Sequence, residues 1–359
     1  MDYSRFFSLA APNVDCISTW NELKRIRQTE KPVSYEMLYG LPNRETFPFM
    51  KAKVTLENEQ TFDIDDKVMA TLLQYAGQVG YQPLIEHIKV LTERLHDPPL
   101  WSERGVVVVN GSLNGMDKIF QMFLNKGDTV FIPMCCYHGV FVVGKHLQPN
   151  FVSIQADEEG IVPDSFKEAL IKCKDSGGVP KFLYVNPGGS NPTGTVLSES
   201  RRRIIYELAC QYDILIVEDD PYYYLQFCDD IPASFLRLDT EGRVIRLESF
   251  SKTIGAGMRL GFAILPKHIA RVLTQMLVST IMHTSMFSQV LVSRLFDTWG
   301  VDGFLRKTGE ICEFYRRQRN MSLQAAERHL KGLCEWSIPM GGFFLWLKVS
   351  ITTFYKNGK

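Results

Sequence analysis

The chain has 359 residues, of which 45% are hydrophobic, so it can bury a large core and divide into two domains. Lys and Arg together number 40, as do Asp and Glu, so a formal net charge of zero gives no electrostatic reason to expect nucleic acid or an anionic membrane as a partner. The absence of a window of about eighteen apolar residues argues against a membrane span, and the scattered cysteines, without a C-x-x-C pair, argue against zinc and a disulfide framework.

The N-terminal segment carries too little positive charge and too short an apolar run for a secretory signal. We therefore expect a soluble protein of a reducing compartment, either the cytoplasm or the mitochondrial matrix, and not a secreted one. Residues 1 to about 50 predict an arm and an ordered loop, since they show no sustained periodicity and end in the turn-rich YGLPNRETFPF. Apolar residues then recur at helical spacing over 65–76 and 83–95, which predicts two amphipathic helices.

The central part consists of short runs rich in β-branched and aromatic residues. Helical segments lie between most of these runs, for example over 198–212. Strands of near-continuous apolar content that alternate with helices predict an α/β fold with a mostly parallel sheet covered on both faces. The predicted strands cover 105–111, 128–133, 150–157, 181–187, 213–220, 244–250 and 259–266.

The last part predicts a smaller α+β domain. Two long helical patterns cover about 267–299 and 302–330, and the strand-like run GGFFLWLKVS covers 341–350. A lone aromatic-rich strand needs partners to cover its faces and edges, so this domain looks incomplete. The expected division is an N-terminal arm with part of the small domain (1–60), a large ligand-binding domain (61–266), and inter-domain helices with a truncated small domain (267–359).

Polar side chains follow the predicted strands where each strand ends, which is where doubly wound sheets bind their ligands. Ser112 follows GVVVVNG at a helix start, where its hydroxyl and the amides of Ser112 and Leu113 can hold a phosphate or where Ser112 is a plain N-cap. Tyr137, after DTVFIP, can stack on a flat ligand or simply pack. Asn191 lies in the turn GGSNPTG, and Asn in such turns usually bonds its own backbone.

Two further strand ends carry charged side chains. VEDDPYY places Asp219 and Asp220 at the tip of a hydrophobic strand, where a carboxylate caps a helix or pairs with a buried cation. The stretch SFSKTIGAGMRLG places Lys252 seven residues before Arg259, as an amine beside an anion-binding turn or as a surface lysine in a glycine-rich loop. Taken together, these groups suit pyridoxal 5'-phosphate (PLP), which needs a lysine for a Schiff base and an acid at its ring nitrogen.

Six motifs then carry a family resemblance: GLPNRETFPF, LQYAGQVGY, SNPTGTVLS, VEDDPYYYLQF, SFSKTIGAGMRLGF and GGFFLW. Their order over nearly the whole chain resembles the fold-type I PLP-dependent aminotransferases of class I/II, within them the kynurenine/2-aminoadipate aminotransferase group. The resemblance implies the three-layer PLP-dependent transferase fold and a homodimer with shared active sites. It also implies transfer of an amino group from a kynurenine, 2-aminoadipate or aromatic L-amino acid to a 2-oxo acid such as 2-oxoglutarate.

The same resemblance implies roles for single residues. Lys252 would carry the cofactor and shuttle protons, and Asp219 would pair with the ring nitrogen. The other implied cofactor contacts are Tyr222 and Asn191 at the phenolic oxygen, Tyr137 over the ring, Ser112, the Leu113 amide, Ser249 and Arg259 at the phosphate, and Tyr75 of the partner subunit. Tyr39, Gly40 and Asn191 are expected to line the substrate site, which contains no metal.

Two alternatives remain open. No residue after Phe344 matches the arginine that binds the substrate α-carboxylate in this family, so a truncated, catalytically weak or inactive PLP-binding chain is one of them. A PLP-dependent Cys-conjugate β-lyase, which would use the same lysine and aspartate, is the other.

Overall fold

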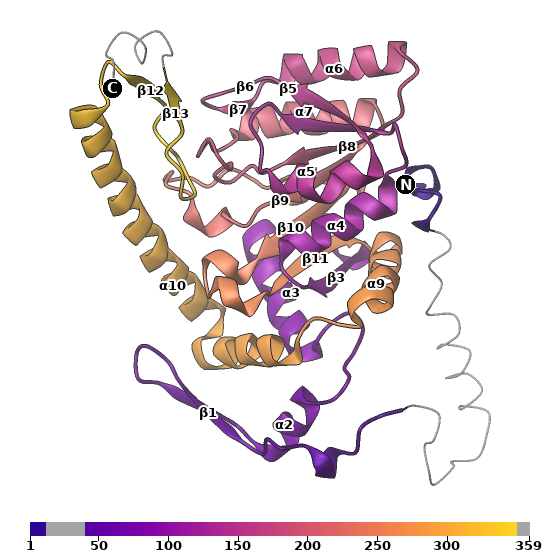
Figure 1. The fold of residues 1–359 in the computed structure, drawn as a ribbon, viewed down its shortest axis with the longest axis vertical. Coiled ribbons are helices and arrows are strands. Elements are labelled where there is room, and N and C mark those ends of the chain that lie inside the picture. The colour runs from indigo at the N-terminus through magenta and orange to yellow at the C-terminus, as the bar shows by residue number, and fades with distance from the viewer. Residues whose placement is uncertain (12–39, 350–359) are drawn as a thin grey trace.

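The computed structural model describes residues 1–11 and 40–349 and is centred on a seven-stranded sheet with the order β3-β11-β10-β9-β8-β4-β5 (Figure 1). Strand β11 runs antiparallel to both of its neighbours, and the other neighbouring strands pair in parallel. The predicted mostly parallel sheet is confirmed. The strands are β3 (Arg104–Val109), β4 (Thr129–Pro133), β5 (Asn150–Ile154), β8 (Pro180–Val185), β9 (Leu215–Asp219), β10 (Val244–Ser249) and β11 (Gly261–Pro266).

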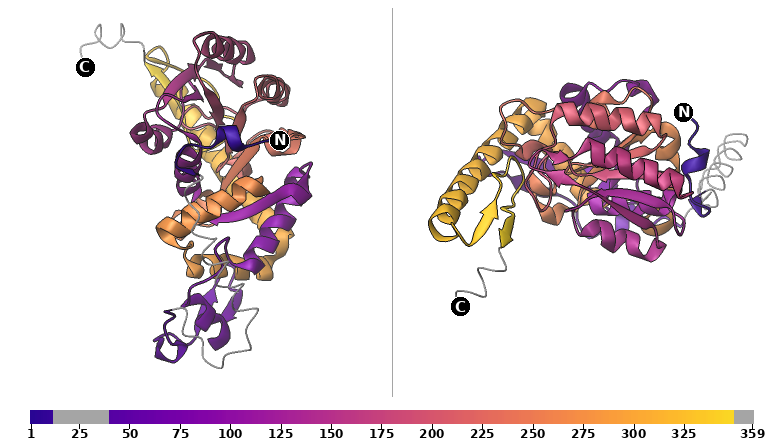
Figure 2. Two further views of the ribbon diagram at one scale, coloured as in Figure 1. Left: turned by 90° about the vertical axis from the view of Figure 1, so that its right-hand side faces the viewer. Right: turned by 90° about the horizontal axis from the view of Figure 1, so that it is seen from above.

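Alternate residues of these strands face two separate apolar cores, one on each side of the sheet. In β9, Ile216 belongs to one core, whereas Leu215 and Val217 belong to the other. Figure 2 shows helices on both sides of the sheet, which gives the three layers expected of an α/β fold. The first core is covered by α3 (Gln82–His96), α6 (Pro163–Asp175), α7 (Glu199–Gln211), α8 (Phe235–Leu238) and α10 (Met286–His329), and the second by α4 (Ser112–Phe123), α5 (Gly139–Gly144) and α9 (Lys267–Ile281).

Helix α3 illustrates how the sequence forms these elements. Its apolar residues Leu84, Ile88 and Leu91 recur at helical spacing and are all buried in the first core. Pro83 lies in the first turn, where its missing N–H removes no helical hydrogen bond. The helix ends at His96 and is followed by Asp97, which adopts the left-handed conformation.

The long C-terminal helices are divided differently from the prediction. The first ends at Ile281, because Met282 adopts φ 61° and ψ −63°, and α10 then begins at Met286. Residues 282–285 contain neither Gly nor Pro, so their sequence carries no breaker signal and the predicted helix over 267–299 is wrong there. The predicted boundary near residue 300 coincides with a kink at Gly300, which has φ 65° and ψ 175°.

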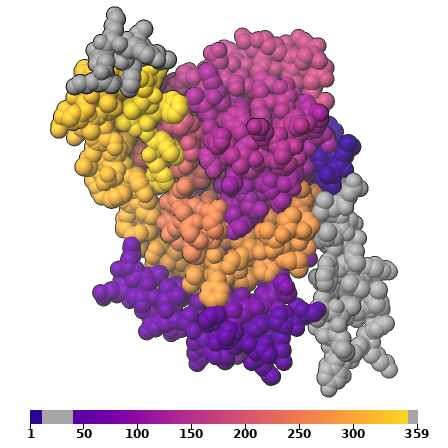
Figure 3. All heavy atoms as spheres, viewed as in Figure 1, coloured from indigo at the N-terminus to yellow at the C-terminus, as the bar shows by residue number. Residues whose placement is uncertain are grey.

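Small hairpins flank the main sheet. The hairpin of β1 (Ala52–Thr55) and β2 (Thr61–Ile64) leads into α2 (Asp66–Leu72) and lies at one end of the molecule (Figure 3). Over the described residues 341–349, the predicted strand is reduced to β13 (Leu347–Val349), which pairs with β12 (Cys334–Trp336), and to an isolated bridge between Gly341 and Gln226. The remaining short elements are β6 (Ala156–Asp157), β7 (Gly160–Ile161), η1 (Ser4–Phe6), η3 (Arg44–Thr46), η4 (Trp101–Glu103), η5 (Lys145–Leu147), η6 (Tyr223–Leu225), η7 (Phe250–Lys252) and η8 (Ala256–Met258). None of the helices within 1–11 and 40–349 is both long and apolar enough to cross a membrane.

Candidate active site

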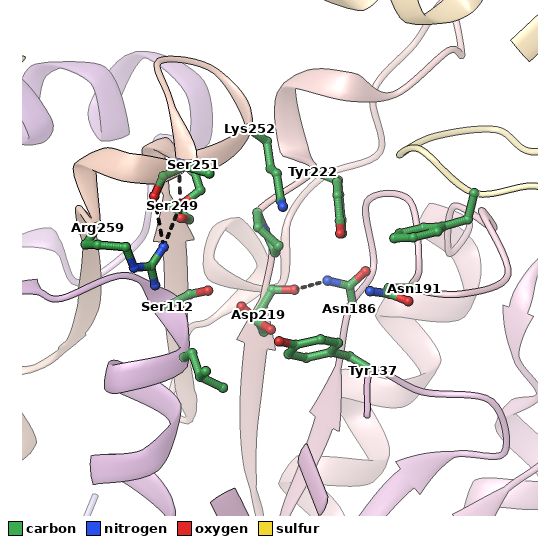
Figure 4. Close-up of a pocket in the computed structure, with 14 residues that line it drawn as sticks. Ser112, Tyr137, Asn186, Asn191, Asp219, Tyr222, Ser249, Ser251, Lys252 and Arg259 are labelled. Carbon is green, nitrogen blue, oxygen red and sulfur yellow. Dashed lines mark hydrogen bonds between the residues drawn. The ribbon is translucent and has the colours of Figure 1, made fainter. Parts of the chain in front are cut away.

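A cavity of about 260 Å³, here called the strand-end cavity, lies where β3, β4, β8, β9 and β10 end (Figure 4). Each of these strands contributes residues from its last position or from the segment that follows it, as expected for a doubly wound sheet. The lining residues are Ser112, Leu113, Tyr137, Asn186, Asn191, Asp219, Pro221, Tyr222, Ser249, Ser251, Lys252, Ala256, Arg259 and Phe344.

Two of the predicted site residues that the structure describes, Gly40 and Tyr75, do not line this cavity. Gly40 is exposed and lies apart from it. Tyr75 is 57% exposed beyond α2, where its ring contacts the ring of His283 with 6.3 Å between centroids. Tyr39 lies outside the described residues.

The Asp219 carboxylate forms the floor of the cavity at the end of β9. Its Oδ2 accepts a hydrogen bond of 2.8 Å from the Tyr184 hydroxyl, and its backbone oxygen accepts one of 2.7 Å from Asn186 Nδ2. Its Oδ1 is buried and accepts no hydrogen bond from the protein. Burial raises the pKa of Asp219 to about 6, although the hydrogen bond from Tyr184 opposes the rise. The carboxylate therefore offers one free buried acceptor to a ligand, and a cationic N–H is the partner that this site favours.

Tyr222, Asn191 and Tyr137 lie on the other side of Asp219 from Arg259 (Figure 4). Burial raises the pKa of the Tyr222 hydroxyl to about 12, with a further rise from the Asp219 charge, so this hydroxyl stays protonated at neutral pH. The Tyr137 ring packs against Gly139, since a Cβ at Gly139 would lie 2.2 Å from that ring. These residues offer hydrogen-bond donors and an aromatic ring to a planar ligand.

The opposite end of the cavity is basic and rich in hydroxyl groups. Arg259 adopts the left-handed conformation, and its guanidinium turns back to donate to the backbone oxygen of Ala256 (3.2 Å) and to Ser251 Oγ (3.4 Å). Ser249 lies beside Ser251, and the Ser249 hydroxyl accepts a hydrogen bond from the backbone N–H of Ser251. Ser112 begins α4, whose free N–H groups and dipole attract an anion. The arrangement can hold a phosphate group.

Lys252 enters the cavity from η7, directly after β10. Its Nζ lies 5.8 Å from the centre of the Tyr222 ring and 5.7 Å from that of the Phe343 ring. Figure 4 shows the amine above Asp219, between the basic end of the cavity and the end formed by Asn186 and Asn191, here called the amide end. Lys252 and Asp219, whose Oδ1 has no protein partner, therefore line one cavity from the ends of two different strands.

Two glycine-containing loops, residues 188–194 and 339–342, cross beside the amide end of the cavity and hold it in place. Met340 and Gly341 both donate to the backbone oxygen of Gly194, and Gly342 donates to that of Leu225. A Cβ at Gly189 would lie 2.6 Å from the Gly342 nitrogen, so the two loops cross without room for a side chain. This crossing carries Phe344 to the cavity and Phe343 to a perpendicular contact with Tyr222 at 5.5 Å between ring centroids.

A buried ionic cluster lies on the opposite face of the sheet from Asp219. Arg246 is 0% exposed and contacts Glu248 Oε1 at 2.7 Å, Glu218 Oε2 at 3.0 Å and Asp220 Oδ2 at 3.1 Å. The side chains of Glu218 and Asp220 face this cluster because they alternate with Asp219 along β9. Of the two aspartates predicted at the strand tip, Asp219 thus lines the cavity and Asp220 pairs with the buried Arg246.

Some cavity residues escape the sequence-based prediction. Asn186 lies in the predicted strand 181–187 and Ser251 in the motif SFSKTIGAGMRLG, so considering every polar residue of these segments would have found both. Phe344 lines the cavity, whereas Tyr184 contacts Asp219 without lining it, and only the structure shows these contacts, because both residues lie in apolar strand-like runs. Within the described parts of the chain, no three His, Cys, Asp or Glu side chains gather in a way suited to a metal ion.

Comparisons with known proteins show which family the chain is similar to. The family model described as aminotransferase class I and II matches residues 47–355. The mitochondrial kynurenine/alpha-aminoadipate aminotransferase of Bos taurus is 39% identical over 364 residues, which cover 97% of this chain and 85% of the relative. Among solved structures, the aminotransferase Aro8 from Candida albicans has a TM-score of 0.91 at 27% identity and covers 100% of this chain and 84% of its own. The Pyrococcus horikoshii kynurenine aminotransferase, solved in complex with PMP, KYN and KYA, has a TM-score of 0.75 at 30% identity, covering 96% of this chain and 82% of its own.

Proposed function

The chain belongs to the aminotransferase class I and II family, and from this premise we propose that it transfers the amino group of a kynurenine, 2-aminoadipate or aromatic L-amino acid to a 2-oxo acid such as 2-oxoglutarate, with PLP as its cofactor. The observation that carries the proposal is the placement of the Lys252 amine and the free Oδ1 of Asp219 in one cavity. The relatives' names support the substrate classes.

The residues of the strand-end cavity fit PLP. The unpaired Oδ1 of Asp219 suits the protonated ring nitrogen, because a buried carboxylate oxygen without a partner is costly and a cationic N–H relieves that cost. Tyr137 would lie against the ring, and Tyr222 and Asn191 would donate to the phenolic oxygen. When bound, PLP supplies an aldehyde for the amine of the lysine or the substrate and a ring that withdraws electrons from the substrate's α-carbon.

Lys252 would act at the substrate's α-carbon. With its Nζ free, the amine would take the α-proton as a base and return a proton as an acid. General acid–base catalysis of this kind accelerates proton transfer by about 10²–10⁴-fold. The rings of Tyr222 and Phe343 lie around this amine and restrict water access to it. Asp219 would hold the proton on the ring nitrogen of a bound cofactor, since an ionised carboxylate stabilises an N–H cation beside it.

The basic end would hold the phosphate of the cofactor. Ser112, the Leu113 amide, Ser249 and Arg259 would donate hydrogen bonds to it, with the α4 N-terminus adding a favourable dipole. Ser251 is a further candidate, because it lies within reach of the Arg259 guanidinium.

Gly111→Ala is expected to weaken PLP binding by about tenfold, which corresponds to about 1.4 kcal/mol. Gly111 has φ 78°, and a Cβ there would lie 2.5 Å from Arg259 Nη2, so the guanidinium must move away from the phosphate position. The measurement is a titration of the purified protein with PLP followed by intrinsic fluorescence. Gly257→Ala in the neighbouring loop is the matched control, since a Cβ there meets nothing within 4 Å, and it should leave the affinity unchanged. Equal affinities for all three proteins would contradict the assignment of Arg259 to the phosphate.

The proposed activity can be tested with the full chain and added PLP. We expect a visible absorption band of bound cofactor that decreases when L-kynurenine or L-2-aminoadipate is added and returns when 2-oxoglutarate follows, with glutamate as a product. The D-enantiomers of the donors are the control and should leave the band unchanged. A band that persists with every L-amino acid would contradict the aminotransferase activity of this chain, and the absence of any band would contradict the cofactor.

We further propose that the chain forms a homodimer in which Tyr75 reaches the strand-end cavity of the partner subunit. Its high exposure at the end of α2 supports this role, since a ring that is 57% exposed is free to contact another chain. Gly40, and Tyr39 beside it, would line the substrate site of the assembled dimer. A mitochondrial or cytoplasmic location is proposed, and the bovine relative's name supports the first.

A further inference from the structure

Tyr184 is a buried tyrosine that touches the Asp219 carboxylate but does not line the strand-end cavity. It lies in β8, where it pairs with Val217 of β9, so its side chain is on the same face of the sheet as Val217 and Asp219. Its side chain is 0% exposed, and its hydroxyl donates to Asp219 Oδ2 at 2.8 Å. Tyr184 therefore acts on any ligand only through Asp219.

The hydrogen bonds of Asp219 leave a single acceptor for a ligand. Tyr184 occupies Oδ2 and Asn186 occupies the backbone oxygen, whereas Oδ1 has no partner. The Tyr184 bond thus determines which carboxylate oxygen remains free. Without that bond, both carboxylate oxygens would be buried and unpaired, and the carboxylate could rotate so that either oxygen takes the position of Oδ1.

We propose that Tyr184 is a positioning residue for amino transfer, whose hydroxyl keeps Asp219 ionised and leaves Oδ1 free for the ring nitrogen of the cofactor. This inference rests on the proposed cofactor, because the charge of Asp219 matters for the reaction only if a cationic ring nitrogen binds beside it.

The charges around Asp219 make its ionisation sensitive to this one bond. Burial raises the pKa of Asp219 to about 6 and the Asp220 charge adds to the rise, whereas Tyr184, Ser112 and Arg246 lower it. Tyr222 and Lys252 are further ionisable groups on the cavity side of the carboxylate, and Cys136 and Tyr137 lie close to Tyr184 itself. Tyr184 stays a donor throughout, because burial and the Asp219 charge raise its own pKa well above the usual value. Loss of its hydroxyl therefore raises the pKa of Asp219 further, toward the neutral range.

The test is the pH dependence of PLP binding to the full chain, followed by fluorescence between pH 5 and 9. Binding to the unmodified protein should weaken as the pH falls below about 6, since Asp219 then takes up a proton. We call this loss of binding at low pH the acid limb. In Tyr184→Phe, the acid limb should shift upward by about one pH unit, the size expected for one hydrogen bond to a charged group. The affinity for PLP at pH 7 should then fall several-fold.

Tyr206→Phe is the matched control. Tyr206 is also buried, and its hydroxyl also donates to a carboxylate, Asp239 Oδ1 at 3.0 Å, but it does not line the strand-end cavity. This variant should leave the acid limb in place. Thermal unfolding of both variants shows whether each is folded, and the Phe ring preserves nearly all of the packing volume in each case.

A second comparison separates positioning from a structural effect. In an Asp219→Asn background there is no carboxylate to keep ionised, so Tyr184→Phe should no longer shift the pH dependence. An unshifted acid limb in the single variant, or the same loss of affinity in the Asp219→Asn background, would overturn the role of Tyr184. Failure of the unmodified chain to bind PLP at any pH would instead contradict the proposed cofactor, and the role of Tyr184 with it.

Discussion

Lys252→Ala is expected to abolish covalent attachment of PLP and to lower the rate of amino transfer by about 10⁴-fold or more, because both the link to the cofactor and the proton-transferring base are lost. Among the described residues that line the strand-end cavity, Lys252 is the only lysine. The measurement combines the visible spectrum with borohydride reduction, which fixes an imine as a stable amine. Peptide mass spectrometry of the reduced, unmodified protein should find the cofactor on Lys252.

Two variants control for charge and for unspecific labelling of lysines. Lys252→Arg keeps a positive charge, but a guanidinium stays protonated and forms no imine under these conditions, so it should behave like the alanine variant. Lys307→Ala removes a lysine that lines a neighbouring cavity and pairs with Glu57 and Glu310, so the label on Lys252 should persist. Cofactor that mass spectrometry finds covalently attached to reduced Lys252→Ala would show that another residue carries it.

Arg246→Leu is expected to lower the free energy of unfolding by about 3–5 kcal/mol, the cost of leaving buried charges without their partner. Arg246 contacts Glu218, Asp220 and Glu248 from one fully buried guanidinium. Leucine fills much of the space but leaves these carboxylates close together in an apolar environment. Urea unfolding monitored by circular dichroism measures the loss.

The loss should depend on pH in a definite direction. In the unmodified protein, the Arg246 charge and the hydrogen bond from His96 outweigh burial and hold the pKa of Glu248 at about 2, so its stabilising contribution is lost only as the pH falls toward that value. In Arg246→Leu, burial and mutual repulsion raise the pKa values of the carboxyls above their unfolded values, so each destabilises the fold as the pH rises. The difference between variant and unmodified protein should therefore shrink when the pH is lowered from 8 to 5.

Arg203→Leu serves as the control for Arg246→Leu. Arg203 is an exposed residue of α7 that pairs with Glu199 one helical turn away at 2.6 Å. Exposed pairs of this kind contribute about 0.3–0.5 kcal/mol, so this variant should unfold almost as the unmodified protein does. Similar losses for both arginines, or a loss at Arg246 that is the same at every pH, would contradict the stabilising role of the buried cluster.

The sheet and the main site loop were predictable because their signals are local. Strands β4, β9 and β10 fall within the predicted runs, since a strand buried on both faces must be apolar at nearly every position. Lys252 and Arg259 follow such strands in a glycine-containing loop, and strand ends converge at one edge of a parallel sheet. Spacing along the chain was therefore enough to place them together.

Other features depend on contacts between distant segments. The break at Met282 follows residues without Gly or Pro, and the expected strand over 341–350 is mostly a loop because its glycines pack against Gly189 and Gln226. Neither effect leaves a periodic signal in the sequence, because both arise from packing between residues that are far apart in the chain.

The sequence by itself determined the α/β class, the order of the strands along the chain and the polar residues that follow the strand ends, because burial and strand ends leave local patterns. Only the tertiary structure decided how Glu218, Asp219 and Asp220 divide their roles. Side-chain alternation separates Asp219 from its neighbours, but the pairing of β9 with β8 and β10 places Tyr184 beside it and Arg246 behind it. The physical reason is that the ionisation of a buried carboxylate depends on its partners in space, and those partners come from other strands.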